Sequence, residues 1–337
     1  MRQVELPIYP VVYPTGHRLN QNESQFPLPD RIKNQLDSLT YHDLHEYPVE
    51  PINELFERYA AYVGVTPEQL LVGCGSDEMI HVVTQALLAP HDIVLSPAPD
   101  FSMYPIFTTI AHGHHVQAVD LSYQGMVKAI ETHYPKLLLL SNPNNPTGKL
   151  WSVEELTHLA SLVPYIVVDE AYMDFTPDAS MIPCIATLPN LIVLRTMSKA
   201  FGLANVRIGF MVTNCELAHY FRQFIPPFNI SGVSAKICNI FLKDTIYLQE
   251  TIEWHDEMRQ KWAQAFETIG HVLPATTNFL YVELEQPEAV WTHLTDLNVH
   301  TSKQPTGMRV TLGDDTALKL TQLAIQQYVE SMNVKNS

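Results

Sequence analysis

The apolar residues between positions 70 and 214 fall into short, unbroken runs separated by more polar stretches. Short runs rich in Val, Ile and Leu are typical of strands that are buried on both faces of a sheet. We therefore expect strands at 70–73, 92–96, 115–119, 136–142, 165–172, 191–198 and 208–214.

Helices are predicted between several of these runs. "SVEEL" places Ser152 as an N-cap and Glu155 as the reciprocal member of a capping box. "SDEMIHVVTQALL" places Ile80, Val83 and Leu87 on one face of a helix. Alternation of strands and helices predicts a mostly parallel α/β sheet with helices on both faces.

The pattern changes after about residue 230. A long helical stretch of mixed polarity, 231–268, precedes the strand-like segment "NFLYVEL", more helix, and "MRVTL" at 308–312. This pattern is typical of a smaller α+β unit, against which the proline-rich first thirty residues are expected to pack. We expect a small α+β domain of residues 1–34 plus 246–337, and a large α/β domain of residues 35–245.

Composition and charge narrow the possible partners. The chain has 337 residues, of which 46% are hydrophobic and 17% charged, as in ordinary globular proteins. Its formal net charge of −16 argues against nucleic acid or an anionic membrane as a main partner. No apolar run approaches the roughly 18–20 residues that span a bilayer, so we expect a soluble, cytoplasmic protein.

The cysteines and histidines give little sign of a metal. The four cysteines are scattered, and no C-x-x-C pair indicates a zinc site or a disulfide framework. "AHGHH" at 111–115 admits either a metal site or a solvated turn. It has no acidic or cysteine partner in register, so we expect no metal.

Polar segments follow several of the predicted strands. Ligands of parallel sheets bind beyond the carboxyl ends of the strands. Four strands end there in "GCGSDE", "NPNNPTGK", "DEAY" and "RTMSKAFG". This coincidence predicts one ligand site at that edge of the sheet.

Two of these segments suit a phosphate. In "GCGSDE", Ser76 and Asp77 begin a helix whose N–H groups and dipole favour anions, although a plain strand–helix turn has the same sequence character. The segment is neither a Walker loop nor a dinucleotide fingerprint. In "TMSKAFGLANVRIG", the side chains of Thr196, Ser198 and Arg207 offer further donors.

Two charged residues lie at the ends of buried strands. Asp169 needs a partner when buried, either a protonated ring nitrogen or a neighbouring arginine. Lys199 follows a strand directly, and it is either a solvated lysine at a helix start or an amine that bonds to a cofactor.

These motifs resemble a known family. "SNPNNPTGK", "VVDEAY" and "TMSKAFGLANVRIG", in this order, resemble the fold-type I pyridoxal-phosphate enzymes, in particular the class I/II aminotransferases. "LNQNES", "LHEYPVE", "VGCGSDEMI" and "APDFSMY" are similar to the histidinol-phosphate aminotransferase branch. The resemblance runs from about residue 17 to about residue 315. It implies the pyridoxal-phosphate-dependent transferase fold of type I, pyridoxal 5′-phosphate as cofactor, and a homodimer with shared active sites.

The resemblance also implies a role for each matching residue. Lys199 would form a Schiff base with the cofactor and move the substrate Cα proton, and Asp169 would pair with the pyridine nitrogen. The cofactor's remaining contacts would be Asn145 and Tyr172 at the ring 3′-oxygen, Phe101 on the ring face, and Ser76, Asp77, Thr196, Ser198 and Arg207 at the phosphate.

Further residues are implied at the substrate end. Arg309 would grip the distal anionic group of the substrate, Asn22 would line the substrate pocket, and Tyr47 would reach the cofactor phosphate and substrate of the neighbouring subunit. The branch usually has a second arginine ahead of Arg309, where "NVHTSKQPTGMR" offers Lys303.

The chain departs from the family pattern at two further positions. Cys74 stands where asparagine is common. Asn205 stands where glycine is usual, and asparagine tolerates a left-handed backbone, so we expect the turn to be kept.

The resemblance favours an aminotransferase that works in two half-reactions. Histidinol phosphate as donor and 2-oxoglutarate as acceptor, in histidine biosynthesis, are the first expectation. An aromatic amino acid is the second, and decarboxylation of threonine phosphate is the third. A transcription regulator of this fold would need an added DNA-binding domain, and a nicotinamide oxidoreductase would need a glycine fingerprint that is missing.

Overall fold

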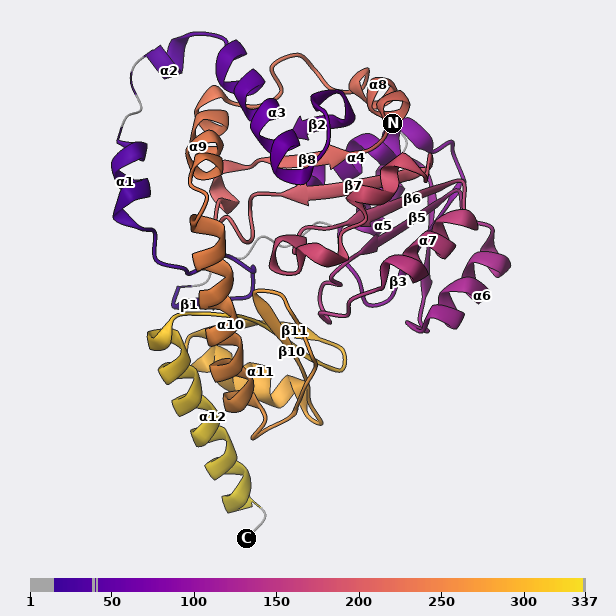
Figure 1. Ribbon diagram of the computed structural model, residues 1–337. Helices are drawn as coiled ribbons and strands as arrows, with labels where there is room; N and C mark the ends of the chain where they lie inside the picture. The colour runs from indigo at the N-terminus through magenta and orange to yellow at the C-terminus, as the bar shows by residue number, and fades with distance from the viewer. Residues whose placement is uncertain (1–14, 38–39, 41, 336–337) are drawn as a thin grey trace, which may run out of the picture.

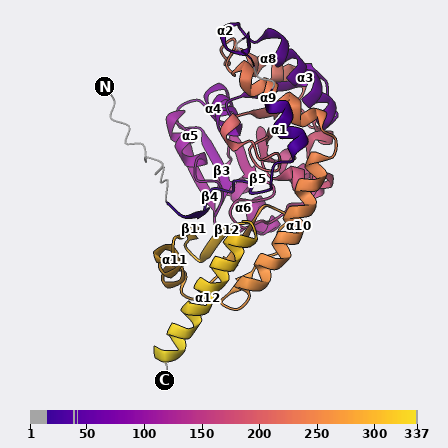
Figure 2. The same cartoon turned by 90° about the vertical axis from the view of Figure 1, so that its left-hand side faces the viewer.

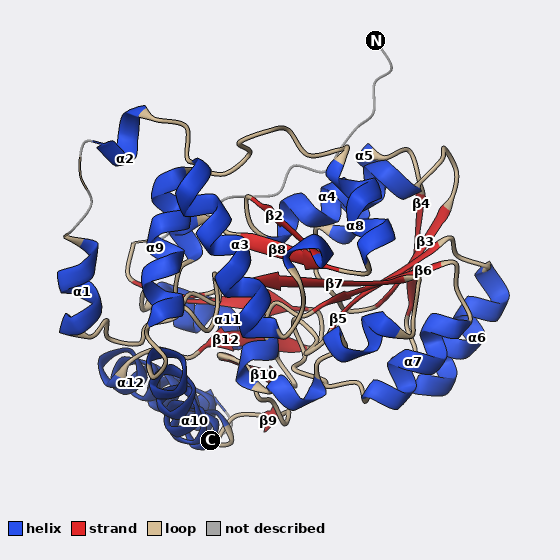
Figure 3. Cartoon of the chain, turned by 45° about the horizontal axis from the view of Figure 1, so that its top comes forward, coloured by secondary structure: helices blue, strands red, loops and turns tan. Residues whose placement is uncertain are grey.

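The computed structural model describes residues 15–37, 40 and 42–335. Within them lie two sheets, each with its own helices (Figure 1). Figure 3 shows the strands of the larger sheet running between layers of helix. The separate cores of these two units carry the framework of the site.

The larger sheet has the strand order β2-β8-β7-β6-β5-β3-β4. Its strands run in one direction except β8, which is antiparallel to both of its neighbours. A mostly parallel sheet, as predicted, is therefore confirmed. The strands are β2 Leu70–Gly73, β3 Ile93–Pro97, β4 His114–Ala118, β5 Leu137–Ser141, β6 Tyr165–Asp169, β7 Leu191–Thr196 and β8 Gly209–Val212.

Helices cover both faces of this sheet, because successive side chains of a strand point to opposite sides. Leu138 and Leu140 of β5 pack in one core with α3, α6, α7 and α9, whereas Leu137 and Leu139 pack in another with α4, α5 and α8. The helices of this part are α1 Asp30–Leu36, α2 His42–His45, α3 Val49–Val63, α4 Ser76–Leu87, α5 Tyr104–Ile110, α6 Tyr123–His133, α7 Val153–Ser161, α8 Cys215–Arg222 and α9 Gly232–Lys243.

The two helix starts that the sequence predicts are as expected. Ser152 and Glu155 form the capping box of α7. Ile80 and Val83 of α4 are fully buried, and Leu87 is partly buried against the same core.

The smaller sheet has the order β1-β11-β12-β10-β9. Leu280, Val282, Met308 and Val310 point from it into a core with α10, α11 and α12. Figure 2 shows α10 and α12 side by side. The elements are β1 His17–Leu19, β9 His271–Val272, β10 Phe279–Glu283, β11 Val299–Gln304, β12 Gly307–Thr311, α10 Tyr247–Phe266, α11 Pro287–Asp296 and α12 Asp315–Lys335.

Two sequence predictions for this part need qualification. The expected continuous helical stretch at 231–268 is two helices, α9 and α10, because the chain leaves helical geometry at Asp244. The expected packing of the first thirty residues on the smaller unit is seen for β1, which pairs in parallel with β11, whereas residues 1–14 lie outside the described residues. The domain boundaries at 34/35 and 245/246 stay a prediction.

Candidate active site

A cavity of about 260 Å³ lies at the carboxyl edge of the larger sheet. Ser141 at the end of β5 and Asp169 at the end of β6 are direct neighbours in the sheet. The structure brings to this cavity every site residue named from the sequence except Tyr47: Asn22, Ser76, Asp77, Phe101, Asn145, Asp169, Tyr172, Thr196, Ser198, Lys199, Arg207 and Arg309.

Asp169 is a buried acid without an arginine partner. Its carboxylate accepts hydrogen bonds from the Tyr104 hydroxyl and the Ala171 backbone N–H, both at 3.2 Å. Burial raises the pKa of Asp169 to about 7. The neighbouring Arg195 is engaged elsewhere. Its Nε lies 3.0 Å from a Glu170 carboxylate oxygen, and its Nη1 lies 2.7 Å from Asp174. No ion pair of Asp169 is found among residues 15–37, 40 and 42–335, so the carboxylate form calls for a cation from a ligand.

Lys199 points into the same cavity. It is half-buried, its Nζ donates to the Gln21 carbonyl at 3.3 Å, and Nζ lies 5.6 Å from the centroid of the Tyr172 ring. It follows β7 directly, so the rigid sheet fixes its position. A freely solvated lysine at a helix start is therefore not what the structure shows.

One end of the cavity is built around the first turn of α4. Gly75, with a left-handed φ of +79°, precedes Ser76, and a Cβ at Gly75 would lie 2.6 Å from Nη2 of Arg207. A Cβ at Gly209 would collide with the backbone nitrogen of Ser76. The two glycines let the β8 backbone and a guanidinium approach the helix start closely. Exposed N–H groups beside a guanidinium form a seat for an anion.

Hydroxyl groups lie beside this seat. Thr196 Oγ1 is 2.9 Å from Ser198 Oγ, and Arg207 Nη2 donates to Asp77 at 3.3 Å. Arg207 itself has the left-handed backbone, with φ +58°, while Asn205 lies in a short 3₁₀ turn, Ala204–Val206. The chain therefore turns here with Asn205 in place of glycine, and the left-handed residue is Arg207, two positions later.

The opposite end of the cavity holds Arg309. Its Nη1 donates to Asn145 Oδ1 at 2.6 Å, and its Nη2 donates to the Asn20 carbonyl. The guanidinium lies 5.8 Å from the centroid of the Phe279 ring. A planar fork held in this way suits a carboxylate or phosphate.

Lys303 does not join Arg309. In the β11–β12 ladder it lies opposite Met308, so it points to the helix-covered face of the smaller sheet. Its Nζ pairs with Glu288 and lies 5.5 Å from the Trp291 ring. The residue opposite Arg309 is Ser302. Lys303 therefore does not take the place of a second substrate arginine.

Sequence reasoning missed several residues of the site. Asn20 and Gln21 contribute main-chain carbonyls, which no residue type reveals. Ser141 lines the cavity, and its hydroxyl donates to the partly buried Asp100, whose pKa desolvation raises to about 8. Tyr104 lies within "APDFSMY", and its residue type alone does not reveal that its hydroxyl donates to Asp169.

Tyr47 lies outside the cavity. It is 78% exposed, between α2 and α3, and its ring stacks on Phe228 with centroids 4.6 Å apart. In the single chain it touches none of the other site residues named from the sequence.

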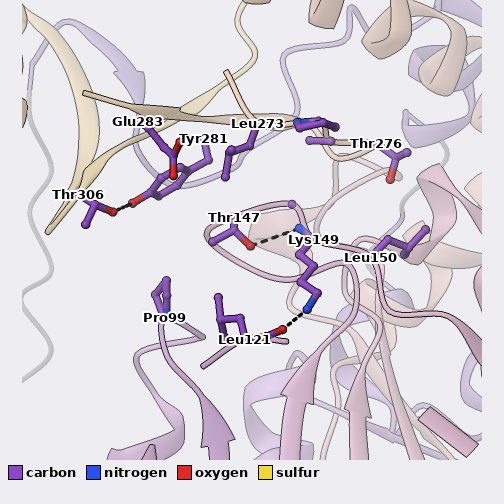
Figure 4. A pocket seen from close by; sticks show the side chains of 13 residues that line it. Pro99, Leu121, Thr147, Lys149, Leu150, Leu273, Thr276, Tyr281, Glu283 and Thr306 are labelled. Atoms are coloured by element: carbon purple, nitrogen blue, oxygen red, sulfur yellow. Dashed lines mark hydrogen bonds between the residues drawn. The ribbon is translucent and has the colours of Figure 1, made fainter. Parts of the chain in front are cut away.

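A second, larger cavity has a volume of about 610 Å³ (Figure 4). It lies between the loop at 147–150 and the smaller sheet, where the hydroxyls of Tyr281 and Thr306 are 2.8 Å apart. None of the site residues named from the sequence lines it. Its size alone therefore does not make it the better candidate, because the titratable groups converge in the smaller cavity.

The metal and membrane questions can be addressed for the described residues. They contain no group of three or more His, Cys, Asp or Glu side chains placed to hold a metal ion. His114 and His115 belong to strand β4 instead of a solvated turn, and His115 Nε2 lies 3.0 Å from Ser96 Oγ.

No helix in the described part of the chain is long and apolar enough to cross a membrane.

Fold and site together define a class of protein. A doubly covered α/β sheet that presents in one cavity a lysine amine, a buried carboxyl with no ion pair among the described residues, and an anion seat is the framework of a pyridoxal-phosphate-dependent transferase of fold type I. The family model for aminotransferase class I and II matches residues 15–323. The chain belongs to this family, and it is an aminotransferase.

Comparison with individual proteins agrees with this family assignment. The chain is 34% identical over 296 residues to a histidinol-phosphate aminotransferase of Caldanaerobacter subterraneus subsp. tengcongensis, covering 85% of this chain and 84% of the relative. A histidinol-phosphate aminotransferase from Sinorhizobium meliloti, solved in complex with pyridoxal-5′-phosphate, superposes with a TM-score of 0.88 at 23% identity, over 96% of each chain. The L-threonine-O-3-phosphate decarboxylase of Porphyromonas gingivalis has the same fold, with a TM-score of 0.79 at 18% identity over 93% and 99% of the two chains.

Proposed function

We propose that the protein uses pyridoxal 5′-phosphate to transfer the amino group of L-histidinol phosphate, or of a related amino donor, to 2-oxoglutarate. The observation that carries the proposal is the placement of Lys199 and Asp169 in one cavity, with an anion seat at one end and Arg309 at the other. The relatives named histidinol-phosphate aminotransferase support this donor.

The residues of the cavity fit the cofactor. Among the described residues the buried carboxyl of Asp169 has no ion-pair partner, and Gly75 and Gly209 allow Arg207 and the β8 backbone to lie against the start of α4, where a phosphate would bind. When bound, pyridoxal phosphate supplies an aldehyde that condenses with amines and a ring that withdraws electrons. Asp169 would hold the ring nitrogen, Phe101 the ring face, Asn145 and Tyr172 the ring oxygen, and Ser76, Asp77, Thr196, Ser198 and Arg207 the phosphate.

The side chains of this cavity then divide the work. Lys199 Nζ would accept the proton from the substrate Cα as a general base and then deliver it, as a general acid, to the cofactor carbon that carried the aldehyde. Asp169, as a carboxylate, keeps a proton on the ring nitrogen by charge pairing. Arg309 orients the substrate through its anionic group, so that the reacting carbon lies near Lys199.

Arg309 is expected to determine substrate affinity. Arg309→Ala should raise KM for an anionic donor by roughly 10- to 100-fold, because a charge-assisted pair is worth about 1.5–3 kcal/mol. Steady-state kinetics with and without the substitution measure this. Lys303→Ala is the matched control, because Lys303 lies on the other face of the sheet and its loss should leave KM unchanged. An unchanged KM in Arg309→Ala for every donor would remove this residue from the substrate site.

The identity of the donor needs a direct experiment. The holoenzyme would be mixed with L-histidinol phosphate or L-phenylalanine without a keto acid, and loss of the cofactor's visible absorption would report the first half-reaction. Bleaching by histidinol phosphate alone supports the proposal, and bleaching by phenylalanine alone favours the aromatic alternative. Release of carbon dioxide from threonine phosphate without any keto acid would select the decarboxylase, because both activities occur on this fold.

The proposal includes a homodimer with shared sites. Leu44, Tyr47, Val49 and Phe228 are 72%, 78%, 57% and 49% exposed, and the Tyr47 and Phe228 rings stack on each other. Exposed large apolar side chains that lie together mark an interaction surface. A second copy of the chain would cover this surface, and Tyr47 would reach the cavity of that copy.

Subunit complementation tests this arrangement. Tyr47→Ala and Lys199→Ala homodimers should each have low activity, and mixing them with subunit exchange should restore about a quarter of the wild-type activity, since half of the dimers then hold one intact site. Mixed Lys199→Ala and Asp169→Asn subunits are the control: both residues serve the same chain's cavity, so every site in a mixed dimer carries one defect. Sedimentation of a monomer at assay concentration would contradict the proposal.

A further inference from the structure

Three consecutive residues, Asn20 to Asn22, each contact a residue of the proposed catalytic machinery. The Asn20 carbonyl accepts from Arg309, the Gln21 carbonyl accepts from Lys199, and Asn22 Nδ2 donates to the Tyr172 hydroxyl at 2.8 Å. Asn22 is 1% exposed and has a left-handed φ of +54°. Asparagine tolerates this backbone better than most residues, so the position is built for a specific contact.

All four polar groups of Asn22 are satisfied within the chain. Its backbone N–H donates to Thr311 Oγ1 at 3.0 Å, and its carbonyl accepts from Asn278 Nδ2 at 3.0 Å. Its side-chain oxygen accepts from the Thr311 hydroxyl at 3.0 Å, and its Nδ2 donates to Tyr172. Each polar group of Asn22 is therefore already engaged by a residue of the protein. The sequence assignment of Asn22 to the substrate pocket places it correctly at the cavity, but these contacts indicate a different task.

The direction of these hydrogen bonds follows from one fixed donor. A backbone N–H can only donate, so Thr311 Oγ1 accepts there and has its own proton to give away. Asn22 Oδ1 is the acceptor within reach. If the amide were reversed, the fully buried Thr311 hydroxyl would have no acceptor among the described residues, which costs about 1–3 kcal/mol. The Asn22 amide is thus locked with its NH₂ group toward Tyr172.

The locked amide decides what Tyr172 can do. The Tyr172 oxygen already accepts a hydrogen bond from Asn22, so its own O–H is left to donate to an acceptor in the cavity that Tyr172 lines. We propose that Asn22 and Thr311 are positioning residues that make Tyr172 a hydrogen-bond donor to an oxygen of the bound ligand. The inference rests on the proposed function, in which that oxygen is the ring oxygen of pyridoxal phosphate.

The test measures how the visible absorption of the bound cofactor changes with pH, and takes the pH at the midpoint of that change. A donor to the ring oxygen stabilises negative charge there, so its loss raises the midpoint. Tyr172→Phe should raise it by about one pH unit. Valine has the same shape as threonine but cannot hold the Asn22 amide in one orientation. Thr311→Val should therefore raise the midpoint by less than Tyr172→Phe does. Thr311→Ser, which restores the hydroxyl, should return it to the wild-type value.

A double-mutant cycle shows whether Thr311 acts through Tyr172. In the Tyr172→Phe background, Thr311→Val should produce no further shift. The affinity for pyridoxal phosphate can be measured by quenching of the apoprotein's tryptophan fluorescence. The dissociation constant should rise across the variants in the same order as the midpoints rise. Asn22→Asp is the second variant in case Thr311→Val does not fold. Its carboxylate accepts hydrogen bonds from both hydroxyls, so the Tyr172 O–H should donate to it instead of to the ligand. Asn22→Asp should therefore shift the midpoint more in the protein with Tyr172 than in the Tyr172→Phe background.

The outcomes separate this inference from the proposed function. A wild-type protein that fails to bind pyridoxal phosphate would overturn the proposed function, and this inference with it. A wild-type protein that binds it, with the same midpoint in Thr311→Val or with equal shifts in both backgrounds, would overturn only the inference.

Discussion

Lys199→Ala should lower the rate of transamination by at least about 10⁴-fold, because it removes both the nucleophilic amine and the proton carrier. Lys199 supplies the only primary amine among the residues that line the cavity, so no described neighbour can replace it. Single-turnover measurements with saturating donor separate this effect from binding. The affinity for pyridoxal phosphate should fall less than the rate, because the anion seat at α4 remains.

Two controls make the result for Lys199 specific. A small amine such as methylamine in the buffer should restore part of the rate in Lys199→Ala, because a free amine can carry the Cα proton into the vacated space. Lys149→Ala changes a lysine that faces the larger cavity and should retain the wild-type rate. Turnover of Lys199→Ala within tenfold of wild type would refute the catalytic role.

Asp169→Asn should have opposite effects on activity and on apoprotein stability. Activity should fall by roughly 10²- to 10⁴-fold, because the amide keeps the shape but cannot charge-pair with a protonated ring nitrogen. The apoprotein, in contrast, should become more stable at pH 8, since the buried carboxyl no longer has to be accommodated there.

The pH dependence of stability follows from the raised pKa of Asp169. Its ordinary pKa is 3.8, and burial raises it to about 7 in the folded protein. Between about pH 4 and pH 7 the unfolded chain loses this proton while the folded chain keeps it. The free energy of unfolding therefore falls as pH rises through this window, by up to a few kcal/mol, and the loss is complete above it.

Urea unfolding of the two apoproteins between pH 4 and pH 8 measures this slope. Asp169→Asn should lose the part of the decline that comes from Asp169 and keep the part from Asp100, whose pKa burial raises to about 8. Parallel stability curves for the two proteins would show that Asp169 is ionised in the folded apoprotein throughout. Full activity in Asp169→Asn would contradict its pairing with the ring nitrogen.

The sequence was sufficient for the larger sheet and for the gathering of the cavity side chains. Strands buried on both faces leave long apolar runs, and parallel strands deliver their ends to one edge, so Lys199, Asp169 and Asn145 could be placed together before any coordinates. The capping box at Ser152 could also be predicted from the sequence, because it depends on two side chains three residues apart.

The remaining parts depend on information that residue types do not carry. The carbonyls of Asn20 and Gln21 act through the main chain, which every residue possesses. Lys303 was considered for the substrate site because it is the basic residue available in the stretch where the branch usually has a second arginine. The register of β11 on β12 places Lys303 on the opposite face, and a slip of one residue would reverse that outcome.

The direction of hydrogen bonds was also beyond the sequence. The hydrogen bonds that orient the Asn22 amide come from distant parts of the chain. Thr311 is 289 positions from Asn22, and Tyr172 is 150 positions from it. The tolerance of asparagine for a left-handed backbone suggested that the turn at Asn205 is kept, but residue type did not reveal that the left-handed residue is Arg207.

The pairing of β1 with β11 has a consequence for how the chain matures on the ribosome. His17–Leu19 can form this pair only after Val299–Thr301 have emerged, late in translation. Lys199 and Asp169 are by then already made and their strands can assemble, but Asn22 still lacks Thr311 and Asn278, and Arg309 is not yet made. A nascent chain therefore carries the Lys199 amine well before the residues that close the cavity around it are in place.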